Sequence, residues 1–342
     1  MRVLVLGGSG FVGGAIARGL LAEGHEVRVL SRGPQAVEGA DAMQGDLADP
    51  RSLAAAAERC DVVVHAAGEA SHRASAKALG WINVAGTENA LKGARHASVR
   101  RFVYISCTDV SLSVEPRVGW NEDRFPRGGP ISELGRSKLR AEEAVIGAGT
   151  TEFETVVLRP AQVWGPGDTS TLPGWAAESA MGIPLFGAGT NLIGTTYVDN
   201  LGAAVVFALQ TPEAAGAVFH IVDAEMTLAR DFFGDIAESL NAPAPRKGLS
   251  WRVEYARAQV RRRLRQAGPW PTDVLRRARS ASFDQLRARD VLGYEPKVSQ
   301  ADGMKALAAW IEAQGGAKAV ASAGRAPATD ESVADQISAA YE

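Results

Sequence analysis

Three glycines, spaced three residues apart, follow the first apolar run of the chain. Residues 2–6 predict a strand buried on both faces of a parallel sheet, because branched apolar side chains follow one another without polar alternation. The glycines come next, and an apolar-periodic helix is predicted over residues 11–23. Such a turn lets a pyrophosphate approach backbone amides at the positive end of a helix dipole. The sequence therefore predicts a dinucleotide-binding turn made of Gly7, Gly10, Phe11, Val12 and Gly13.

The end of the second predicted strand carries information on the type of dinucleotide. This strand covers residues 26–30 and is followed by Ser31 and Arg32. An acidic side chain at this point would bind the ribose 2′-hydroxyl of NAD, whereas an arginine suits the 2′-phosphate of NADP. Ser31 and Arg32 therefore favour NADP, with NAD as the alternative. Arg32 could also be a solvated loop charge without a ligand.

Strands and helices alternate over the first half of the chain. After the second strand we expect a short third strand over 44–47, a helix ending near residue 58 with Asp49 as its N-cap, and a strand from residue 61. A long helix over 74–95, a strand over 101–106, a helix over 132–146 and a strand over 155–158 follow. This alternation predicts an α/β fold, a Rossmann-type doubly wound parallel sheet.

The second half of the chain alternates less regularly, which predicts a smaller and mostly helical substrate-binding region. We expect a dinucleotide-binding domain over residues 1–165, to which residues 195–222 return with a late strand at 218–222. A substrate-binding region then covers residues 166–314. Residues 315–342 are rich in Ala, Gly and Ser and predict a flexible tail, with a short helical stretch over 331–341.

Composition limits the classes of partner. The 342 residues carry a net charge of −2, which gives no reason to expect nucleic acid. The two cysteines make no disulfide framework, no apolar run is long enough to span a membrane, and the first residues do not resemble a signal peptide. A cytoplasmic protein is expected, with no metal site and with a homodimer as one option.

Residues 246–280 differ from the rest of the chain by their charge. They contain eleven lysines and arginines and two acidic residues, with aromatic and aliphatic side chains between them. An amphipathic helix on an anionic membrane surface would have this composition. A solvated basic face folded over the substrate cleft would have it as well. Peripheral membrane contact is therefore one of two interpretations.

Several short motifs occur together in a characteristic order. Each is weak alone, but their order and spacing resemble the extended short-chain dehydrogenases/reductases of the NAD-dependent epimerase/dehydratase group, with the nearest likeness to 3-beta-hydroxysteroid dehydrogenase-like proteins and 2-alkyl-3-oxoalkanoate reductases. The motifs are GGSGFVGG at 7–14, GDLADP at 45–50, HAAG at 65–68, NVAGT at 83–87, LRPAQVWGPGD at 158–168, TYVDN at 196–200 and LGYEPKVS at 292–299.

The resemblance implies roles for several residues. Asp46 and Leu47 would border the adenine, Ala66 and Ala67 would lie along the cofactor, and Pro160 would contact it. Chemistry in the family uses a tyrosine, a lysine four residues later and a serine or threonine after the strand at 101–106. The tyrosine exchanges a proton with the substrate oxygen while hydride moves to or from the nicotinamide.

The catalytic motif of the family is incomplete in this sequence. Lys138 stands at the lysine position, where it would also reach the nicotinamide ribose, but Leu134 stands at the tyrosine position. The serine or threonine position falls on Cys107, with Ser106 or Thr108 as substitutes if the strand end is shifted by one residue. Leucine has no proton to donate. The candidate catalytic residues are therefore Lys138, Cys107 and Thr108.

Two functions follow from this pattern. The first is an NAD(P)-dependent oxidoreductase acting on a carbonyl or secondary alcohol, with an atypical acid–base site. The second is an NAD(P)-binding sensor or scaffold without turnover. The substrate pocket is expected from residues 110–125, 163–186 and 246–280, and four aromatic residues of these stretches favour an apolar small molecule: Trp120, Trp164, Trp175 and Phe186.

Overall fold

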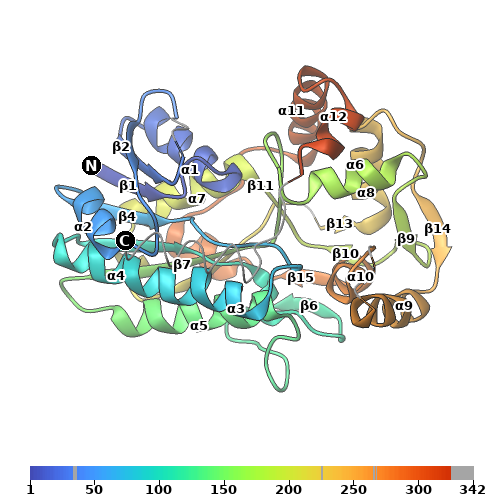
Figure 1. Cartoon of the computed structure of the whole chain (residues 1–342), viewed down its shortest axis with the longest axis horizontal. Helices are drawn as coiled ribbons and strands as arrows, with labels where there is room; N and C mark the ends of the chain where they lie inside the picture. The colour runs from blue at the N-terminus through green and yellow to red at the C-terminus, as the bar shows by residue number, and fades with distance from the viewer. Residues whose placement is uncertain (34–36, 225, 265, 267, 325–342) are drawn as a thin grey trace.

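A seven-stranded parallel sheet forms the centre of the larger part of the molecule, on the left of Figure 1. The computed structural model describes residues 1–33, 37–224, 226–264, 266 and 268–324. The strand order is β12–β7–β5–β4–β1–β2–β3, which confirms the predicted α/β Rossmann-type sheet. The strands are β1 (Arg2–Leu6), β2 (Glu26–Ser31), β3 (Asp41–Gln44), β4 (Val62–His65), β5 (Arg101–Ile105), β7 (Glu154–Pro160) and β12 (Val218–Ile221).

The direction of the strand order reverses between β1 and β4. The chain passes from β1 outward to β2 and β3, then crosses back to β4 and proceeds through β5 and β7 to β12. Val3 of β1 pairs with Val27 on one side and Val62 on the other, so the strand is enclosed by neighbours of the same apolar type. In open parallel sheets, ligands bind in the crevice that forms at the carboxyl ends of the strands at such a reversal.

Helices cover both faces of the sheet. Two helices, α1 (Phe11–Ala22) and α7 (Val198–Gln210), pack together on one face. The other face is covered by α2 (Pro50–Ala57), α4 (Gly86–His96) and α5 (Glu133–Ala148), which lie in front of the sheet in Figure 1. Asp49 caps α2 as expected, since its carboxylate accepts a hydrogen bond of 2.9 Å from the amide of Arg51.

Two elements of this part differ from the sequence prediction. The third strand covers Asp41–Gln44 instead of 44–47, because residues 45–47 leave the sheet and Asp46 turns the chain by accepting a hydrogen bond from the Ala48 amide. The long helix expected over 74–95 consists of α3 (Ala76–Leu79), a π-helical turn at Gly80–Ala85 and α4. Such π-helical turns are frequent at functional sites.

The smaller part of the molecule lies on the right of Figure 1 and has its own core. This cap region packs α6 (Leu172–Ser179), α8 (Ala229–Ser239), α11 (Gln300–Ala313) and α12 (Ala317–Ser322) around Trp164, Trp175 and Phe232. Two further helices, α9 (Trp251–Arg263) and α10 (Pro271–Ala278), lie beside it. Short strand pairs complete the cap region: β8 (Gln162–Trp164) with β11 (Thr195–Tyr197), β9 (Pro184–Phe186) with β14 (Arg246–Leu249), β10 (Leu192–Ile193) with β13 (Thr227–Leu228), and β6 (Arg117–Trp120) with β15 (Ala281–Phe283).

The start of the expected tail is helical. Residues 317–322 form α12, which packs against α6 and buries Val320. The expectation of a flexible segment from residue 315 was therefore wrong for these residues, because the apolar side of α12 completes the core of the cap region. The stretch at 331–341 lies outside the described residues.

The carboxylate of Asp223 joins the sheet and the cap region. This residue follows β12, and its two oxygens accept hydrogen bonds from Trp164 Nε1 (3.0 Å), Thr195 Oγ1 (2.9 Å), the Tyr197 amide (2.8 Å) and Asn200 Nδ2 (2.9 Å). Because buried polar groups are stable only when they are hydrogen-bonded, the four donors and the carboxylate fix one another.

Two buried histidines predict how the stability of the fold depends on pH. Burial, with a smaller effect of the Lys138 charge, lowers the pKa of His65 to about 3, and burial followed by the Arg159 charge lowers that of His220 to about 3. An unfolded chain would protonate both near pH 6.5. The unfolded state therefore binds more protons in this interval, so the stabilisation is present above pH 6.5 and is lost as pH falls towards 3.

We expect the free energy of unfolding to be roughly 2–5 kcal/mol lower at pH 4.5 than at pH 7. Urea titrations at the two pH values measure this difference. The double variant His65→Gln/His220→Gln, compared with its own value at pH 7, should show a smaller decrease. An equal decrease in both proteins would contradict the role of these two residues.

Candidate functional site

The glycine turn between β1 and α1 leaves no space for side chains. Gly7 has a φ of +81°, and a Cβ atom on it would lie 2.7 Å from Ala67 Cα. A Cβ atom on Gly13 would lie 2.2 Å from the carbonyl oxygen of Gly7, much closer than atoms can approach. Gly10, the N-cap of α1, has no side chain to occupy the first free amides. The turn therefore brings bare backbone and a helix N-terminus to the crevice between β1 and β4.

A large cavity opens beside this turn and encloses about 1370 Å³, including its open mouth. We call it the cofactor cleft. Eight of the residues predicted to bind the dinucleotide line it: Gly7, Gly10, Ser31, Arg32, Asp46, Leu47, Ala66 and Ala67. Five other residues predicted to bind the dinucleotide are not in its lining, although the first three of them belong to the turn itself: Phe11, Val12, Gly13, Lys138 and Pro160. The residues present fit an extended dinucleotide, since a cradle of glycines lies at one side and small alanines lie along the floor.

The far end of the cofactor cleft carries the residues predicted for the adenosine. The Ser31 hydroxyl donates to the carbonyl of Gly33 (2.8 Å), and Gln44 Nε2 donates to the carbonyl of Arg32 (3.0 Å), so the backbone here is fixed. The side chain of Arg32 is exposed, and no ion pair of it occurs within the described part of the chain. Its guanidinium is therefore available to a ligand.

Several residues of the cofactor cleft were not predicted from the sequence. Trp81, Ile82 and Asn89 line it from the π-helical turn and α4, and Asn89 Nδ2 donates to the carbonyl of Leu47 (2.9 Å). The motif at 83–87 lies between them and was a signal that this segment faces the cofactor. The remaining lining residues that were not predicted to bind the dinucleotide are Leu6, Ser9, Leu30, Gly45, Ala48, Gly68, Glu69 and Gly86.

Lys138 does not line the cofactor cleft, but it lies behind Gly68, which does. Its Nζ donates to the carbonyl of Ile105 (3.0 Å), lies 5.0 Å from the centre of the Tyr104 ring and would be 3.4 Å from a Cβ atom on Gly68. Burial lowers the pKa of Lys138. The side chain thus places a cation between the cleft and the end of β5.

The chain after β5 runs from Ile105, whose carbonyl accepts a hydrogen bond from Lys138, to the lining of a second cavity. Burial, and then the Asp109 charge, raises the pKa of Cys107 to about 12, so its thiol stays protonated at neutral pH. Thr108 begins a short 3₁₀ turn (Thr108–Ser111), and its Oγ1 makes no hydrogen bond to a described residue. Thr108 lines the second cavity, whereas Cys107 does not. Of these two candidates, the threonine is therefore the one that a substrate can reach.

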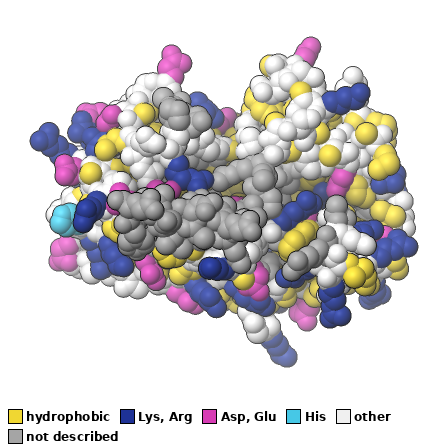
Figure 2. Space-filling model, in the orientation of Figure 1, with side chains coloured by type: hydrophobic (Ala, Val, Ile, Leu, Met, Phe, Trp, Pro, Cys, Tyr) yellow, Lys and Arg dark blue, Asp and Glu magenta, His cyan; other side chains and the backbone are white. Residues whose placement is uncertain are grey.

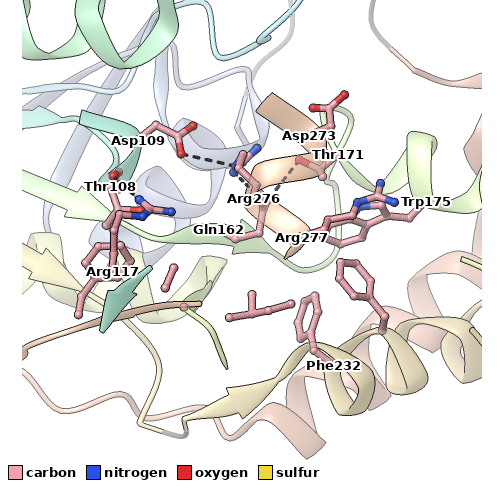
Figure 3. Close-up of a pocket in the computed structure, with 15 residues that line it drawn as sticks. Thr108, Asp109, Arg117, Gln162, Thr171, Trp175, Phe232, Asp273, Arg276 and Arg277 are labelled. Carbon is pink, nitrogen blue, oxygen red and sulfur yellow. Dashed lines mark hydrogen bonds and ion pairs between the residues drawn. The ribbon is translucent and has the colours of Figure 1, made fainter. Parts of the chain in front are cut away.

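The second cavity lies between the sheet and the cap region, and we call it the substrate pocket (Figure 3). Charged and aromatic side chains line it together, since Arg117 lies over the ring of Phe283 and Arg277 over that of Phe233. The polar residues are Thr108, Asp109, Arg117, Gln162, Thr171, Asp273, Arg276 and Arg277; the apolar ones are Trp175, Ile193, Phe232, Phe233, Ala281 and Phe283, with Gly194 between them.

The substrate pocket agrees with the sequence prediction only in part. Each of the three predicted stretches contributes, but of the four aromatic residues named in advance only Trp175 lines it. Trp120, Trp164 and Phe186 are buried in separate apolar clusters. Phe232, Phe233 and Phe283 take their place, and no local signal in the sequence distinguishes them from ordinary core residues.

Arg276 of α10 reaches across the substrate pocket to the sheet. Its Nε lies 3.5 Å from Asp109 Oδ1, its Nη1 lies 3.0 Å from His72 Nε2, and its Nη2 donates to Gln162 Oε1. Asp109 also pairs with His72 through its other oxygen (2.9 Å). Burial would raise the pKa of Asp109, but the charges of Arg276, then of His72 and Arg117, hold it well below its usual range.

The basic segment contributes to this pocket and to the surface. Arg276 and Arg277 lie in the substrate pocket, while α9 exposes Val253, Val260 and Leu264. Figure 2 shows Lys and Arg side chains mixed with hydrophobic ones at its lower right, where α9 and α10 lie in Figure 1. Among the described helices, none combines the length and the apolar character that a membrane crossing requires.

Comparison with known proteins gives the family. Residues 3–222 match the model of the NAD dependent epimerase/dehydratase family. The chain belongs to this family. A 2-alkyl-3-oxoalkanoate reductase of Stenotrophomonas maltophilia is 31% identical over 331 residues, with 90% of this chain and 99% of that protein covered. A 3 beta-hydroxysteroid dehydrogenase/Delta 5→4-isomerase of Mycobacterium tuberculosis is 30% identical over 320 residues, with 86% of each covered.

Solved structures agree with this membership. The dTDP-glucose 4,6-dehydratase DesIV of Streptomyces venezuelae, solved with NAD, superposes with a TM-score of 0.73 at 25% identity and covers 92% of this chain and 98% of that one. A UDP-glucose 4-epimerase of Thermotoga maritima gives 0.72 at 22% identity, covering 92% and 99%, and shows the shared fold alone. The epimerase/dehydratase family and these relatives make the chain an NAD(P)-dependent oxidoreductase of the extended short-chain type, acting on a small molecule.

Leu134 occupies the position at which the resemblance to the family predicts a tyrosine. Its side chain is buried and packs against Ala74 and Leu79. The Ser137 hydroxyl donates to its carbonyl (2.9 Å) and receives a hydrogen bond from Asn83 Nδ2 (3.0 Å). Position 134 therefore contributes packing to the start of α5, and no proton donor stands there.

The geometry of the glycine turn predicts the effect of one added methyl group. In Gly13→Ala the new Cβ atom would overlap the Gly7 carbonyl, so the turn must open. We expect NADPH affinity to fall about 10-fold or more and the melting temperature to decrease. Fluorescence titration and thermal unfolding measure both.

The matched control for this variant is Gly147→Ala in α5, where nothing lies within 4 Å of the added Cβ atom. It should bind NADPH like the wild type and gain up to about 1 kcal/mol of stability. Unchanged NADPH binding by Gly13→Ala would show that the turn does not hold the pyrophosphate.

Proposed function

We propose that the chain is an NADP-dependent reductase or dehydrogenase that interconverts a ketone and a secondary alcohol on a largely apolar small molecule. The observation that carries this proposal is the position of Lys138 at the end of β5, next to chain segments that line each of the two cavities. Its Nζ lies beside Gly68, which lines the cofactor cleft, and it interacts electrostatically with Cys107, which precedes two residues of the substrate pocket. A dinucleotide and a substrate can therefore meet at the end of β5.

The apolar residues of the substrate pocket support a substrate with a hydrocarbon skeleton. Trp175, Phe232 and Phe283 are among them, together with Ile193. Apolar surface removed from water contributes about 25 cal/mol per Å² to binding. The relatives named above, an oxoalkanoate reductase and a hydroxysteroid dehydrogenase, bear names that also combine an oxygen function with a hydrocarbon.

The choice of NADP rests on Arg32. Its exposed guanidinium, which makes no ion pair with a described residue, belongs to the lining of the cofactor cleft next to Ser31, at the end of β2. Guanidinium groups bind phosphate oxygens through charge-assisted hydrogen bonds. The end of β2 carries no acidic side chain that could accept hydrogen bonds from the ribose hydroxyls of NAD.

Three residues of the chain have separate roles in the proposed reaction. The bound dinucleotide would supply or accept hydride at the substrate carbon. Thr108 Oγ1 donates a hydrogen bond to the substrate oxygen and transfers to it a proton that it replaces from water in the substrate pocket. Lys138 binds the ribose side of the cofactor, and its charge stabilises negative charge that develops on that oxygen. Cys107 stays a neutral thiol and supports the turn.

A sensor or scaffold without turnover is not favoured. Such a protein needs the cofactor cleft alone, whereas this chain also builds a substrate pocket lined by Thr108, whose hydroxyl makes no hydrogen bond to a described residue. The absence of a tyrosine at position 134 changes which group donates the proton and leaves the pocket in place.

Two expectations about association are proposed as well. We infer that α9 makes peripheral contact with an anionic membrane. Val260 and the C-cap residue Leu264 lie seven and eleven positions after Val253, so the three exposed side chains share one helix face, which arginines flank. A homodimer and a cytoplasmic location stay predictions.

The role of Arg32 predicts a preference between cofactors. We expect NADPH to bind about 10-fold more tightly than NADH, and Arg32→Ala to remove this difference by weakening NADPH alone. Fluorescence titrations with both cofactors measure it. Arg140→Ala, which removes an exposed arginine of α5 outside both cavities, should leave both affinities unchanged. Equal affinity of the wild type for NADPH and NADH would exclude the phosphate-binding role.

Thr108 can be tested by removing its hydroxyl at constant shape. We expect Thr108→Val to lower kcat for reduction of methyl 3-oxodecanoate by about 10- to 100-fold, because the substrate oxygen loses its donor, with NADPH binding unchanged. Thr108→Ser should keep most of the activity, and Cys107→Ala should change it by less than about 3-fold. A valine variant as active as the wild type would move the donor elsewhere.

A further inference from the structure

The outer face of α9 carries a row of exposed apolar side chains. Val253, Ala256, Val260 and the C-cap residue Leu264 follow one another at intervals of three or four residues, so they lie on one side of the helix. Val260 is 55% exposed and Leu264 is 62% exposed. We call these four residues the α9 row. An exposed apolar row with charged borders is typical of an interaction site.

Arginines border the α9 row on both sides. Arg252 and Arg263 each precede a member of the row, and Arg257 and Arg261 each follow one. Because each residue turns the helix by about 100°, the two pairs lie on opposite flanks of the row. Within α9 one acidic residue, Glu254, stands against five arginines, and neither Arg252 nor Arg263 forms an ion pair with a described residue. This combination of apolar side chains and cations is complementary to an anionic lipid surface.

The opposite side of α9 rests on α10. Ala258 lies midway between Ala256 and Val260, about 200° around the helix from each. It is buried in one apolar cluster with Val274 of α10 and Phe186 of β9. The α9 row therefore faces away from the molecule, and a surface can cover it without any change in the packing of α9.

Two cation–π contacts join the ends of α9 and α10. The Arg262 guanidinium lies 5.1 Å from the centre of the Trp270 ring, near the end of α9 and the start of α10. At the other ends of the two helices, the Arg279 guanidinium lies 4.8 Å from the centre of the Trp251 ring. Contacts of this geometry are attractive. The two helices therefore form one unit.

With its other side, α10 forms a wall of the substrate pocket. Asp273, Arg276 and Arg277 line the pocket from this helix. Figure 3 shows Arg276 joined to Asp109 across the pocket, and Arg277 pairs with Glu178 of α6. Thus α10 contacts the membrane-type helix α9 on one side and the substrate pocket on the other.

We propose that the α9 row docks on an anionic lipid surface and that the substrate reaches its pocket from this surface, past α10. The apolar side chains enter the boundary between headgroups and acyl chains, and the bordering arginines bind lipid phosphates. Because α9 and α10 form one unit, docking brings a wall of the pocket to the lipid, where an apolar substrate is concentrated. The proposal rests on the proposed function and adds to the membrane contact the route by which the substrate arrives.

Vesicle sedimentation tests the docking surface. The chain with NADP⁺ is mixed with vesicles of phosphatidylcholine alone or of equal parts of phosphatidylcholine and phosphatidylglycerol. We expect at least about 10-fold stronger binding to the anionic vesicles, and a large decrease at high salt, which screens the arginines. The variant Val253→Ser/Val260→Ser/Leu264→Ser should bind them at least about 10-fold more weakly. The matched control Ile146→Ser/Leu286→Ser removes exposed apolar side chains outside α9 and should bind like the wild type.

The wild type alone decides the matter if the triple variant does not fold. Sedimentation with neither kind of vesicle would assign the α9 row to another partner, such as an acidic protein, and overturn the proposal. Equal binding to neutral and anionic vesicles, or undiminished binding of a folded triple variant, would overturn it as well.

Turnover tests the route of the substrate. Methyl 3-oxohexadecanoate, which stays in the bilayer, is offered in equal amounts in neutral and in anionic vesicles, and NADPH absorbance gives the rate. We expect the wild type to reduce it about 10-fold faster in the anionic vesicles, because docking raises the local concentration of the substrate. Methyl 3-oxobutanoate, which has the same reacting group and dissolves in water, should be reduced at one rate with either kind of vesicle.

The two measurements separate failure of the route from failure of the proposed function. Equal rates for the long ester in both kinds of vesicle, with docking intact, would overturn entry from the lipid while the proposed function stands. If neither ester is reduced, the proposed function fails, and sedimentation still decides whether the α9 row docks on an anionic surface.

Discussion

The buried carboxylate of Asp223 determines how the two parts of this molecule meet. It follows the last strand of the sheet and accepts four hydrogen bonds from residues that lie between 23 and 59 positions away in the sequence. One of the donors, Trp164, belongs to the core of the cap region, and another, Asn200, belongs to α7 on the sheet. Because a buried carboxylate is stable only with its donors in place, the cap region cannot shift without a large loss of free energy. The walls of the substrate pocket come from both sides of this junction.

Local patterns made the cofactor cleft predictable from the sequence. The glycines follow a strand of branched apolar residues, and the small residues at 66 and 67 follow a second buried strand. The sequence identifies both strands by itself. Their meeting at one crevice follows from the strand order, which the alternation of strands and helices implies. The third strand was misplaced by three residues because Asp46 ends the extended segment through its own turn.

The substrate pocket could not be predicted to the same extent. Phe232 and Phe283 reach it from α8 and β15. Arg117 reaches it from a two-stranded pair that forms only when residues 281–283 come to lie beside residues 117–120. Nothing near these residues in the sequence separates a pocket wall from a core. The ion pairs of Arg276 and Arg277 could not be predicted either, because each depends on which distant carboxylate the fold brings near.

Arg276 has a consequence that extends beyond the pocket in which it lies. Its guanidinium contacts His72, and His72 belongs to the same loop as Glu69, which lines the cofactor cleft. Occupation of one cavity that displaces this arginine therefore changes the environment of the loop that borders the other. By thermodynamic reciprocity, if the first ligand changes the affinity for the second by some factor, the second changes the affinity for the first by the same factor. Arg276 of α10 is thus a direct side-chain link between the substrate pocket and the loop that borders the cofactor cleft.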